Sequence, residues 1–461
     1  MKVEEASASY VVLRATDTVD WSETTLGEVA DFEMGQAPPG SECNKEGNGT
    51  VFVKAGEFGS LYPIEVEWTT KPLKFGKKGD VFICVVGATA GKLNLGIDCA
   101  IGRSVAAIRP KEGIDTKFIY YQLQPWVLKL RASSSGSAQG VISKAQLSEV
   151  PLLVAPLDQQ KRIVAEIEKQ FSRLDEAVAN LKRVKANLKR YKAAVLKAAV
   201  EGRLVETEAE RARREGRSYE TGAQLLQRIL ETRRSQWQGK GKYKEPAAPD
   251  TTDLPELPEG WVWATADQLT DENRAITYGV IKLGGPVDGG VPVLRSSDVR
   301  QLRIDLDDVK RISPEIAENY RRTFLKGGEV VMTVRGTLGG IAVVPPQCNG
   351  FNVSREVAML ALVDSQMAQL VALFVASAPL ENWLMRRTKG IAYTGINIET
   401  LKALPIPVPP IAEHKRMVAE VERRLSILRE TEAQVDANLL RAVHLRQSVL
   451  SRAFIVPAVT D

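Results

Sequence analysis

An internal duplication constrains the architecture of this chain more than any other feature. The segment "PLLVAPLDQQKRIVAEIEKQFSRLDE" (residues 151–176) recurs as "PIPVPPIAEHKRMVAEVERRLSILRE" (residues 405–430), with 12 of 26 positions identical at an offset of 254. Self-similarity at a fixed spacing indicates that one structural unit is used twice. A chain of 461 residues is also too long for a single core and favours several domains. We therefore predict two similar halves.

The duplication extends upstream of this segment, more weakly. Each half opens near a tryptophan, Trp21 in the first and Trp261 in the second. The further matching pairs are residues 77–92 with 326–341, 102–108 with 354–360, and 136–152 with 390–406.

One glycine-rich stretch of the first half, "GATAGK" (residues 87–92), is close to a phosphate-binding loop. That motif needs four residues between its glycines and a Ser or Thr after the lysine, which holds Mg²⁺. Here three residues separate the glycines and Leu93 follows the lysine; the second copy keeps glycines but loses the lysine. We interpret the stretch as a tight turn between two strands, since glycine reaches positive φ at low cost.

Both halves show the same order of patterns. Short alternating apolar segments typical of strands come first, and a helix at about residues 116–131 or 365–387 follows. A proline-bounded strand then leads into a long helix with no proline inside it until Pro457. This order predicts an α+β fold with a pseudo-two-fold repeat.

The two long helices carry apolar residues that step mainly by three and four, a narrow seam that suits helix-on-helix packing. At ~1.5 Å per residue, about forty residues make a rod of roughly 60 Å. The simplest arrangement pairs the helices antiparallel within one chain, and pairing between two chains is the competing option. The predicted divisions are an N-terminal tail (1–19), a first globular domain (20–157), a first long helix (158–203), a connector (204–258), a second globular domain (259–410), a second long helix (411–456) and a C-terminal tail (457–461).

The connector is polar, charged and rich in proline, and "AQLLQRILETRRSQW" (residues 223–237) inside it predicts a short amphipathic helix. No apolar run approaches the ~20 residues that span a bilayer, and the N-terminus does not look like a secretory signal. We expect a cytoplasmic protein. The four cysteines lie far apart, which disfavours a zinc site or a disulfide framework. His414 and His444 are expected on solvent-facing helix positions.

The net charge of +5 permits a polyanionic partner without requiring one. Residues 159–203 hold twelve Lys/Arg against five Asp/Glu, which fits either a solvated helix face or a surface near phosphates or an acidic partner.

Several segments resemble the conserved regions of type I restriction–modification specificity subunits. They are "APLDQQKRIVAEIE", "PPIAEHKRMVAEVE", "KAAVEGRLVETEAE", the connector "KYKEPAAPDTTDLPELPEGWVW" and the closing "RQSVLSRAF", and the resemblance covers nearly the whole chain. It implies two variable target-recognition domains set apart by an antiparallel coiled coil. It also implies two modification subunits that use S-adenosylmethionine, restriction subunits that use ATP and Mg²⁺, and a specificity chain without a catalytic centre.

The residues agree with a non-catalytic chain, because we find no Asn-Pro-Pro-aromatic motif, no phosphate loop and no metal cluster. A duplicated chain on a rigid spacer makes sense as a ruler that reads two half-sites of double-stranded DNA. A coiled-coil adaptor that binds protein alone is the alternative from another class, and a stand-alone enzyme is a third.

Specific reading requires Arg or Lys toward guanine and Asn or Gln toward adenine. We predict contacts from polar or basic residues on loops at matching places in both halves; for each, a surface residue or a local salt bridge is the alternative. The candidates are Lys54, Lys92, Arg103, Ser134, Ser135 and Gln139 in the first domain, and Arg295, Ser296, Arg335, Thr337, Arg355, Lys389 and Tyr393 in the second.

A matched polar set lies at the two long-helix starts and is predicted to contact partner subunits: Lys161, Arg162, Glu166, Lys415, Arg416 and Glu420. Identical charged residues in copies that otherwise diverge are hard to explain by core packing. The alternative is pairing at i, i+4 on the helix surface, Arg162 with Glu166 and Arg416 with Glu420, worth only ~0.2–0.5 kcal/mol each.

Overall fold

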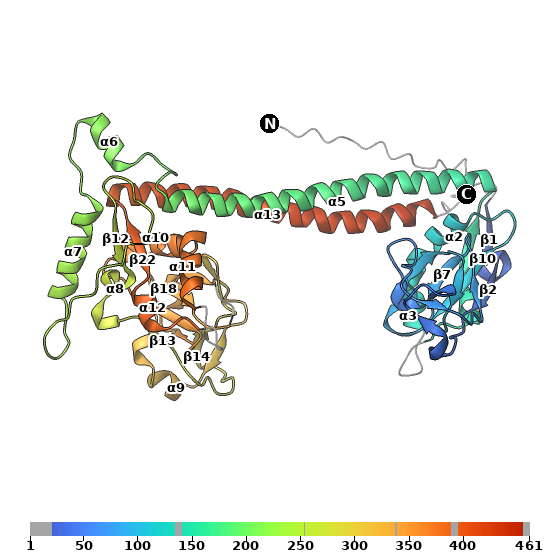
Figure 1. Cartoon of the computed structure of the whole chain (residues 1–461), viewed down its shortest axis with the longest axis horizontal. Coiled ribbons are helices and arrows are strands. Elements are labelled where there is room, and N and C mark those ends of the chain that lie inside the picture. Colours follow the sequence, from blue (N-terminus) through green and yellow to red (C-terminus); the bar gives the residue numbers. More distant parts are fainter. Residues whose placement is uncertain (1–20, 134–140, 253, 337–338, 389–394, 455–461) are drawn as a thin grey trace, which may run out of the picture. The chain divides into compact units, whose positions relative to one another are not determined.

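The computed structural model describes residues 21–133, 141–252, 254–336, 339–388 and 395–454 (Figure 1). The chain divides into two compact units, one made of residues 1–183 and 435–461, the other of residues 184–434. Each unit contains one globular domain and a part of both long helices.

The first globular domain is built on two small sheets. A four-stranded antiparallel sheet has the order β2-β10-β7-β8, and a five-stranded sheet has the order β3-β5-β4-β9-β6. The short pair β1 and β11 leads into the long helix. The strands are β1 Ser22–Thr25, β2 Ala30–Met34, β3 Cys43–Asn44, β4 Thr50–Val53, β5 Trp68–Thr69, β6 Phe75–Gly76, β7 Val81–Cys84, β8 Leu93–Leu95, β9 Cys99–Ile101, β10 Val105–Pro110 and β11 Pro151–Val154; the helices are α1 Leu26–Val29, α2 Thr116–Leu123, α3 Val127–Ser133 and α4 Lys144–Ser148.

The second globular domain repeats this plan. Its four-stranded sheet has the order β13-β21-β18-β19, and β14 lies between β17 and β20 in a second sheet. The strands are β12 Val262–Thr265, β13 Thr277–Tyr278, β14 Val291–Leu294, β15 Val299–Arg300, β16 Arg303–Ile304, β17 Lys310–Ile312, β18 Val330–Thr333, β19 Ile341–Val343, β20 Asn352–Val353, β21 Val357–Leu360 and β22 Pro405–Val408; the helices are α8 Ala266–Leu269, α9 Pro314–Glu318, α10 Ala368–Val375, α11 Ala378–Thr388 and α12 Ile398–Lys402.

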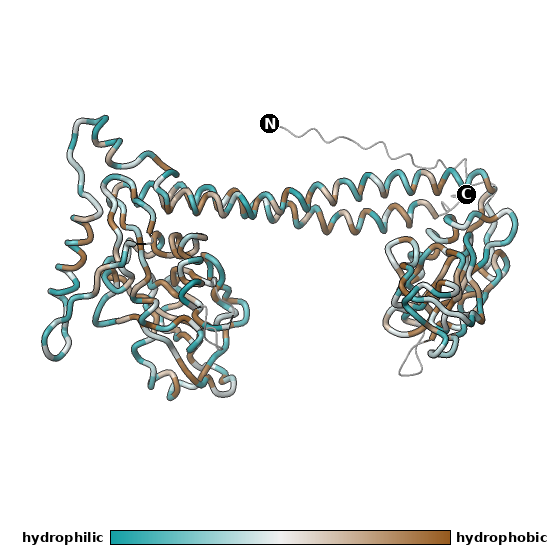
Figure 2. The backbone as a smooth tube through the Cα atoms, in the orientation of Figure 1, coloured by the Kyte–Doolittle hydropathy of each residue, from teal (hydrophilic) through white to brown (hydrophobic). Residues whose placement is uncertain are grey.

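The predicted duplication is confirmed in the central strand pairs. The antiparallel pair β12–β22 matches β1–β11, and the parallel pair β14–β20 matches β4–β9. Apolar residues gather inside both domains and alternate with polar residues along the helices (Figure 2). In the first core the ring of Phe118 packs edge-on against Trp21 and Phe454, and in the second Trp261 packs on Phe374.

The long helices α5 (Leu157–Val200) and α13 (Ile411–Ala453) pack antiparallel inside each unit, as predicted. In the first unit the Arg446 guanidinium lies 4.0 Å from the ring centroid of Phe171, and its Nη1 is 2.9 Å from Asp175 Oδ1. In the second unit Val195 shares one buried cluster with Met417. The direction is antiparallel because later residues of α5 meet earlier residues of α13.

The glycine-rich stretch is a turn between β7 and β8, as interpreted. Gly87 and Gly91 have φ of 76° and 88°, and Gly336 in the second copy has φ of 73°. Gly91 is also packed closely, because a Cβ there would lie 2.8 Å from the carbonyl oxygen of Val127.

The helix expected at residues 365–387 is wrong as a single helix, because α10 and α11 meet at a bend of 75°. Pro379 lies in the first turn of α11 and has no backbone N–H. It therefore cannot donate the hydrogen bond to the carbonyl four residues earlier that a continuous helix requires. Pro125 divides the helix expected at residues 116–131 in the same way, since a short 3₁₀ turn at Gln124–Trp126 separates α2 from α3.

The predicted connector helix is confirmed as α7 (Gly222–Ser235), but a second helix, α6 (Glu208–Glu215), was not predicted. Its signal is present in the sequence. Thr207 and Glu210 form a capping box at its start, and Gly216 ends it with a φ of 65°.

The expectation that both histidines face solvent is right for His444 and wrong for His414. His414 is 3% exposed, and its Nδ1 has no hydrogen-bond partner among the described residues. His414 is buried because it lies in the first turn of α13, which packs against the second domain. The repeat places Gln160 at the matching position, where its side chain bonds to Gly113 and Ala155.

Within the described residues, no single helix is both long and apolar enough to span a membrane, and the bent pair of residues 365–375 and 378–387 meets that requirement only when its helices are joined.

Candidate nucleic-acid interface

Two exposed arginines occupy equivalent places in the two domains. Arg103 lies in the turn between β9 and β10, and Arg355 lies in the turn between β20 and β21. The side chains of both residues face solvent, and neither forms an ion pair within the described part of the chain. Guanidinium groups in this state are free to meet a phosphate or a base edge.

Main-chain hydrogen bonds hold both turns in the same way. Gly102 N–H donates to Val53 O at 2.9 Å, and Ser354 N–H donates to Leu294 O at 2.9 Å. The turns close with bonds from Val105 to Gly102 (2.9 Å) and from Val357 to Ser354 (3.0 Å). Equivalent main-chain hydrogen bonds therefore hold the segment that carries each arginine.

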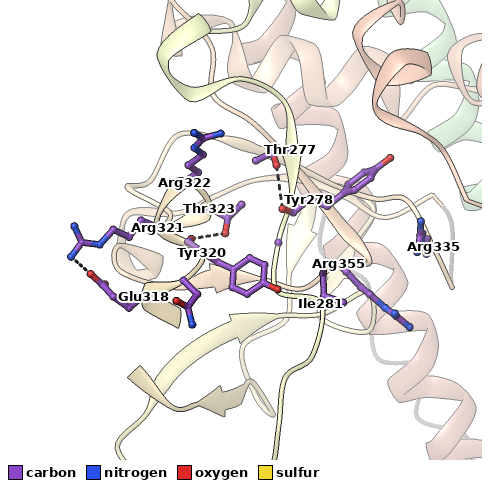
Figure 3. Close-up of a pocket in the computed structure, with 12 residues that line it drawn as sticks. Thr277, Tyr278, Ile281, Glu318, Tyr320, Arg321, Arg322, Thr323, Arg335 and Arg355 are labelled. Atoms are coloured by element: carbon purple, nitrogen blue, oxygen red, sulfur yellow. Dashed lines mark hydrogen bonds and ion pairs between the residues drawn. The ribbon is translucent and has the colours of Figure 1, made fainter. Parts of the chain in front are cut away.

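In the second domain, Arg355 borders an open groove of about 600 Å³ (Figure 3). The groove combines basic, aromatic and amide side chains, the mixture with which proteins contact the phosphates and base edges of nucleic acids. It is lined by Thr277, Tyr278, Gly279, Ile281, Glu318, Asn319, Tyr320, Arg321, Arg322, Thr323, Arg335 and Arg355.

The arginines of this groove differ in their freedom. Arg321 is bound to Glu318, whereas Arg322 is exposed and has no acidic partner among the described residues (Figure 3). The Arg335 guanidinium lies 6.0 Å from the ring centroid of Tyr278, whose hydroxyl donates to Ile396 O at 2.6 Å. The groove therefore holds three guanidinium charges that no described carboxylate neutralises, those of Arg322, Arg335 and Arg355.

In the first domain, Arg103 borders a groove of about 570 Å³ in which one of the basic residues, Lys54, is already paired with a carboxylate. Its Lys54 ammonium is bound to the Glu67 carboxylate and lies 4.0 Å from Glu57 Oε1. The lining residues are Ala37, Pro38, Gly40, Cys43, Asn44, Lys45, Phe52, Lys54, Glu67, Val86, Gly102, Arg103 and Ser104.

The structure brings some predicted DNA contacts together and engages others elsewhere. Arg335 joins Arg355 in the second groove, and Lys54 joins Arg103 in the first. Lys92 instead donates from Nζ to Phe58 O at 2.6 Å. Six predicted contacts lie outside the described residues: Ser134, Ser135, Gln139, Thr337, Lys389 and Tyr393.

Arg295 and Ser296 are held by carboxylates of their own domain. Arg295 donates from Nε and Nη2 to Asp298 at 3.0 Å each, and the Ser296 hydroxyl donates to Glu356 Oε2 at 2.8 Å. These bonds favour the local salt-bridge alternative for Arg295, because both oxygens of the Asp298 carboxylate accept hydrogen bonds from its guanidinium.

Sequence reasoning missed other groove residues because they lie in segments that the duplication does not align. In the second domain these are Asn319, Tyr320 and Arg322, and in the first they are Asn44 and Lys45. The run "ENYRR" (residues 318–322) carried a usable signal, since it interleaves amide, aromatic and basic residues in a loop.

The matched polar set at the helix starts is partly engaged within the chain. Lys161, Arg162 and Lys415 are exposed. The Glu166 and Glu420 side chains bond toward the C-terminal side of their helices, to Gln170 at 2.6 Å and to Arg424 at 2.6 Å.

Arg416, by contrast, anchors the connector. It lies 2.6 Å from Glu208 Oε2 at the start of α6, and the i, i+4 pairs considered above are not among the ion pairs of the described residues. The neighbouring Glu413 is fully buried and accepts bonds from Trp261 Nε1 (3.0 Å) and the Glu208 N–H (2.8 Å). The partner-contact role of the set stays a prediction.

Comparison with known proteins places this architecture in a family. The model for the type I restriction modification DNA specificity domain matches residues 18–190 and 286–437, most of the chain. The chain belongs to this family of specificity subunits. The resemblance noted from the sequence is thereby confirmed.

One relative matches this specificity subunit along most of its length, and another matches about a third of it. The Type I restriction enzyme EcoBI specificity subunit of Escherichia coli is 24% identical over 94% of this chain and 85% of its own length. The putative type I restriction enzyme MjaX specificity subunit of Methanocaldococcus jannaschii is 36% identical over 32% of this chain and 36% of its own.

Solved structures share the fold of this specificity subunit. A chain from a study of complex assembly and conformational transition of the type I R-M system aligns with a TM-score of 0.62 at 18% identity, over 95% of this chain and 98% of that one. The HsdS subunit from Thermoanaerobacter tengcongensis aligns with a TM-score of 0.54 at 17% identity, over 95% and 97%.

Proposed function

We propose that this specificity subunit reads a bipartite target on double-stranded DNA, one half-site with each globular domain. The paired helices α5 and α13 act as the spacer, and the chain docks modification and restriction subunits in the cytoplasm. It performs no catalysis itself. S-adenosylmethionine, ATP and Mg²⁺ would be bound by those partners.

One observation carries the proposal: two exposed arginines, Arg103 and Arg355, stand on the same main-chain scaffold in two domains of one chain. An arginine presented on a rigid turn suits bidentate contact with guanine O6 and N7 in the major groove. A twofold repeat of such readers suits a target with two separated half-sites.

The assembled complex tests the proposal directly. The chain is expressed with its modification subunits and exposed to DNA with S-adenosylmethionine, and methylated adenines are mapped. We expect them to fall within one split sequence whose unread gap has constant length. Methylation scattered without a shared split sequence would contradict the proposal.

Exchange of residues 20–150 for the first domain of another family member is expected to change one half-site and leave the other intact. The reason is that each groove is lined by residues of a single domain. The measurement is the same methylation map, with exchange of residues 259–404 as the reciprocal control. A change of both half-sites after one exchange would contradict the model of two independent readers.

A further inference from the structure

The groove of the first domain contains a basic residue that is already neutralised. The Lys54 side chain is 41% exposed and reaches over the ring of Phe52, with Nζ 5.6 Å from the centroid. Its ammonium is bound to the Glu67 carboxylate, which is 17% exposed, and Glu57 lies within 4.0 Å. Burial is the largest single influence and lowers the Lys54 pKa, but the hydrogen bond to Glu67 and the attraction of the Glu57 and Glu67 carboxylates together raise the pKa on balance. The Lys54 ammonium therefore already has a carboxylate partner within its own domain.

The second domain neutralises the equivalent residue with a different acid. Lys54 follows the last residue of β4, and Arg295 follows the last residue of β14, at the same place beside the arginine-bearing turn. Arg295 is bound by Asp298, three residues further along the chain, whereas Glu67 lies on the segment that leads into β5. The positive charge at this equivalent position is therefore paired with a carboxylate in both domains, but the carboxylate comes from a different place in each. The neighbouring Arg103 and Arg355 have no acidic partner in the described residues.

We propose that Glu67 is a specificity-determining residue that withholds Lys54 from DNA phosphates and so lowers the affinity of the first domain for non-target DNA. The inference rests on the proposed function. Phosphate contacts strengthen binding to every sequence alike, so a lysine removed from that set improves the ratio of target to non-target affinity. Arg103 remains free to contact a base.

The expected size of the effect follows from counterion release. A lysine that gains one phosphate contact steepens the dependence of log K on log [salt] by about 0.9. At about 0.1 M salt this corresponds to roughly eightfold tighter binding to any duplex.

Glu67→Gln in the full-length chain is the first test. Binding to a mixed-sequence 40-base-pair duplex is measured by fluorescence anisotropy over a series of NaCl concentrations. We expect roughly eightfold tighter binding at about 0.1 M salt and a slope steeper by about 0.9. Glu65→Gln is the matched control, because Glu65 is exposed two residues away and forms no ion pair among the described residues. Glu65→Gln should produce neither the eightfold gain in affinity nor the steeper salt slope.

Lys54→Gln is the second test and does not depend on the folding of the first variant. Because Lys54 contacts no phosphate in this proposal, its loss should leave the salt slope for mixed-sequence DNA unchanged, although the Glu67 carboxylate that it frees lowers the affinity by repulsion. The double variant Glu67→Gln/Lys54→Gln should return to the affinity of the unmodified chain. Circular dichroism melting is recorded for every variant.

The outcomes separate this inference from the proposed function. If the unmodified chain binds no duplex, the proposed function itself fails. If it binds but Glu67→Gln matches Glu65→Gln, or Lys54→Gln lowers the slope by about 0.9, Lys54 is not withheld and the inference is overturned. Weaker target binding by Glu67→Gln at unchanged mixed-sequence affinity would make Glu67 a base reader instead, and would overturn it too.

Discussion

Arg355→Ala is expected to weaken binding to the split target by roughly five- to 150-fold, because a good bidentate contact to a base is worth about 1–3 kcal/mol of discrimination. The turn that carries Arg355 is fixed by main-chain bonds, including that from its own N–H to Val280 O at 2.8 Å. Truncation of the side chain therefore removes the contact and leaves the groove intact. The measurement is the dissociation constant for a duplex that carries the mapped target.

The same groove supplies the control for this prediction. Arg321 is bound to Glu318, so Arg321→Ala should change target affinity by much less. Duplexes with either half-site altered locate the contact. Arg355→Ala should lose no further affinity when the second half-site is already altered, and Arg103→Ala should behave in this way for the first half-site. Equal losses on all DNA would make Arg355 a phosphate contact.

Acidification from pH 6.5 to 4 is expected to remove about 3 kcal/mol of stability through His414 alone. Burial lowers the pKa of His414 to about 4, and the opposing attraction of Asp364 is weaker. Between pH 6.5 and 4 the unfolded chain therefore binds a proton at this residue that the folded chain does not bind. The free energy of unfolding falls as pH falls through this window, and the contribution is complete above pH 6.5.

The repeat supplies the variant that tests this effect. His414→Gln places the residue of Gln160 at the equivalent position, and it should flatten the pH dependence of the urea-unfolding free energy between pH 4 and 6.5. His444→Gln is the control, since His444 is exposed on the same helix. Burial raises the pKa of the neighbouring Glu413, which titrates with the opposite sign, so the variant is compared with the unmodified chain at each pH. An unchanged profile would contradict the assignment to His414.

Much of the fold was predictable because the sequence states it twice. Chance matches cannot easily reproduce the alignment of residues 151–176 with 405–430, and the apolar seams of α5 and α13 fix their pairing. Local breaks were less predictable. Pro125 and Pro379 lie inside the two helices that were predicted as continuous, where the helical spacing of the apolar residues around them favoured an unbroken helix. Helix α6 was missed because its segment has the polar composition of a linker.

The site was most predictable where the two copies agree, although Arg335 was also predicted and lies in the second groove. Arg103 and Arg355 align in sequence and coincide in their backbone environment. Arg295 and Lys54 are also equivalent, yet Arg295 is paired with Asp298, three residues away, and Lys54 with Glu67, thirteen residues away, so the alignment of the two halves does not predict either pair. Burial of His414 likewise depends on how the helix start meets its domain, which a helical pattern does not encode.

The two arginine-bearing turns are closed by amide and carbonyl groups, so their shape is independent of the side chain they display. Evolution can therefore exchange the residue at either tip without rebuilding the domain beneath it. If these arginines contact bases as proposed, replacing one by asparagine or glutamine is expected to convert a preference for guanine into one for adenine. On this proposal, the specificity for one half-site can change while the other half-site is kept.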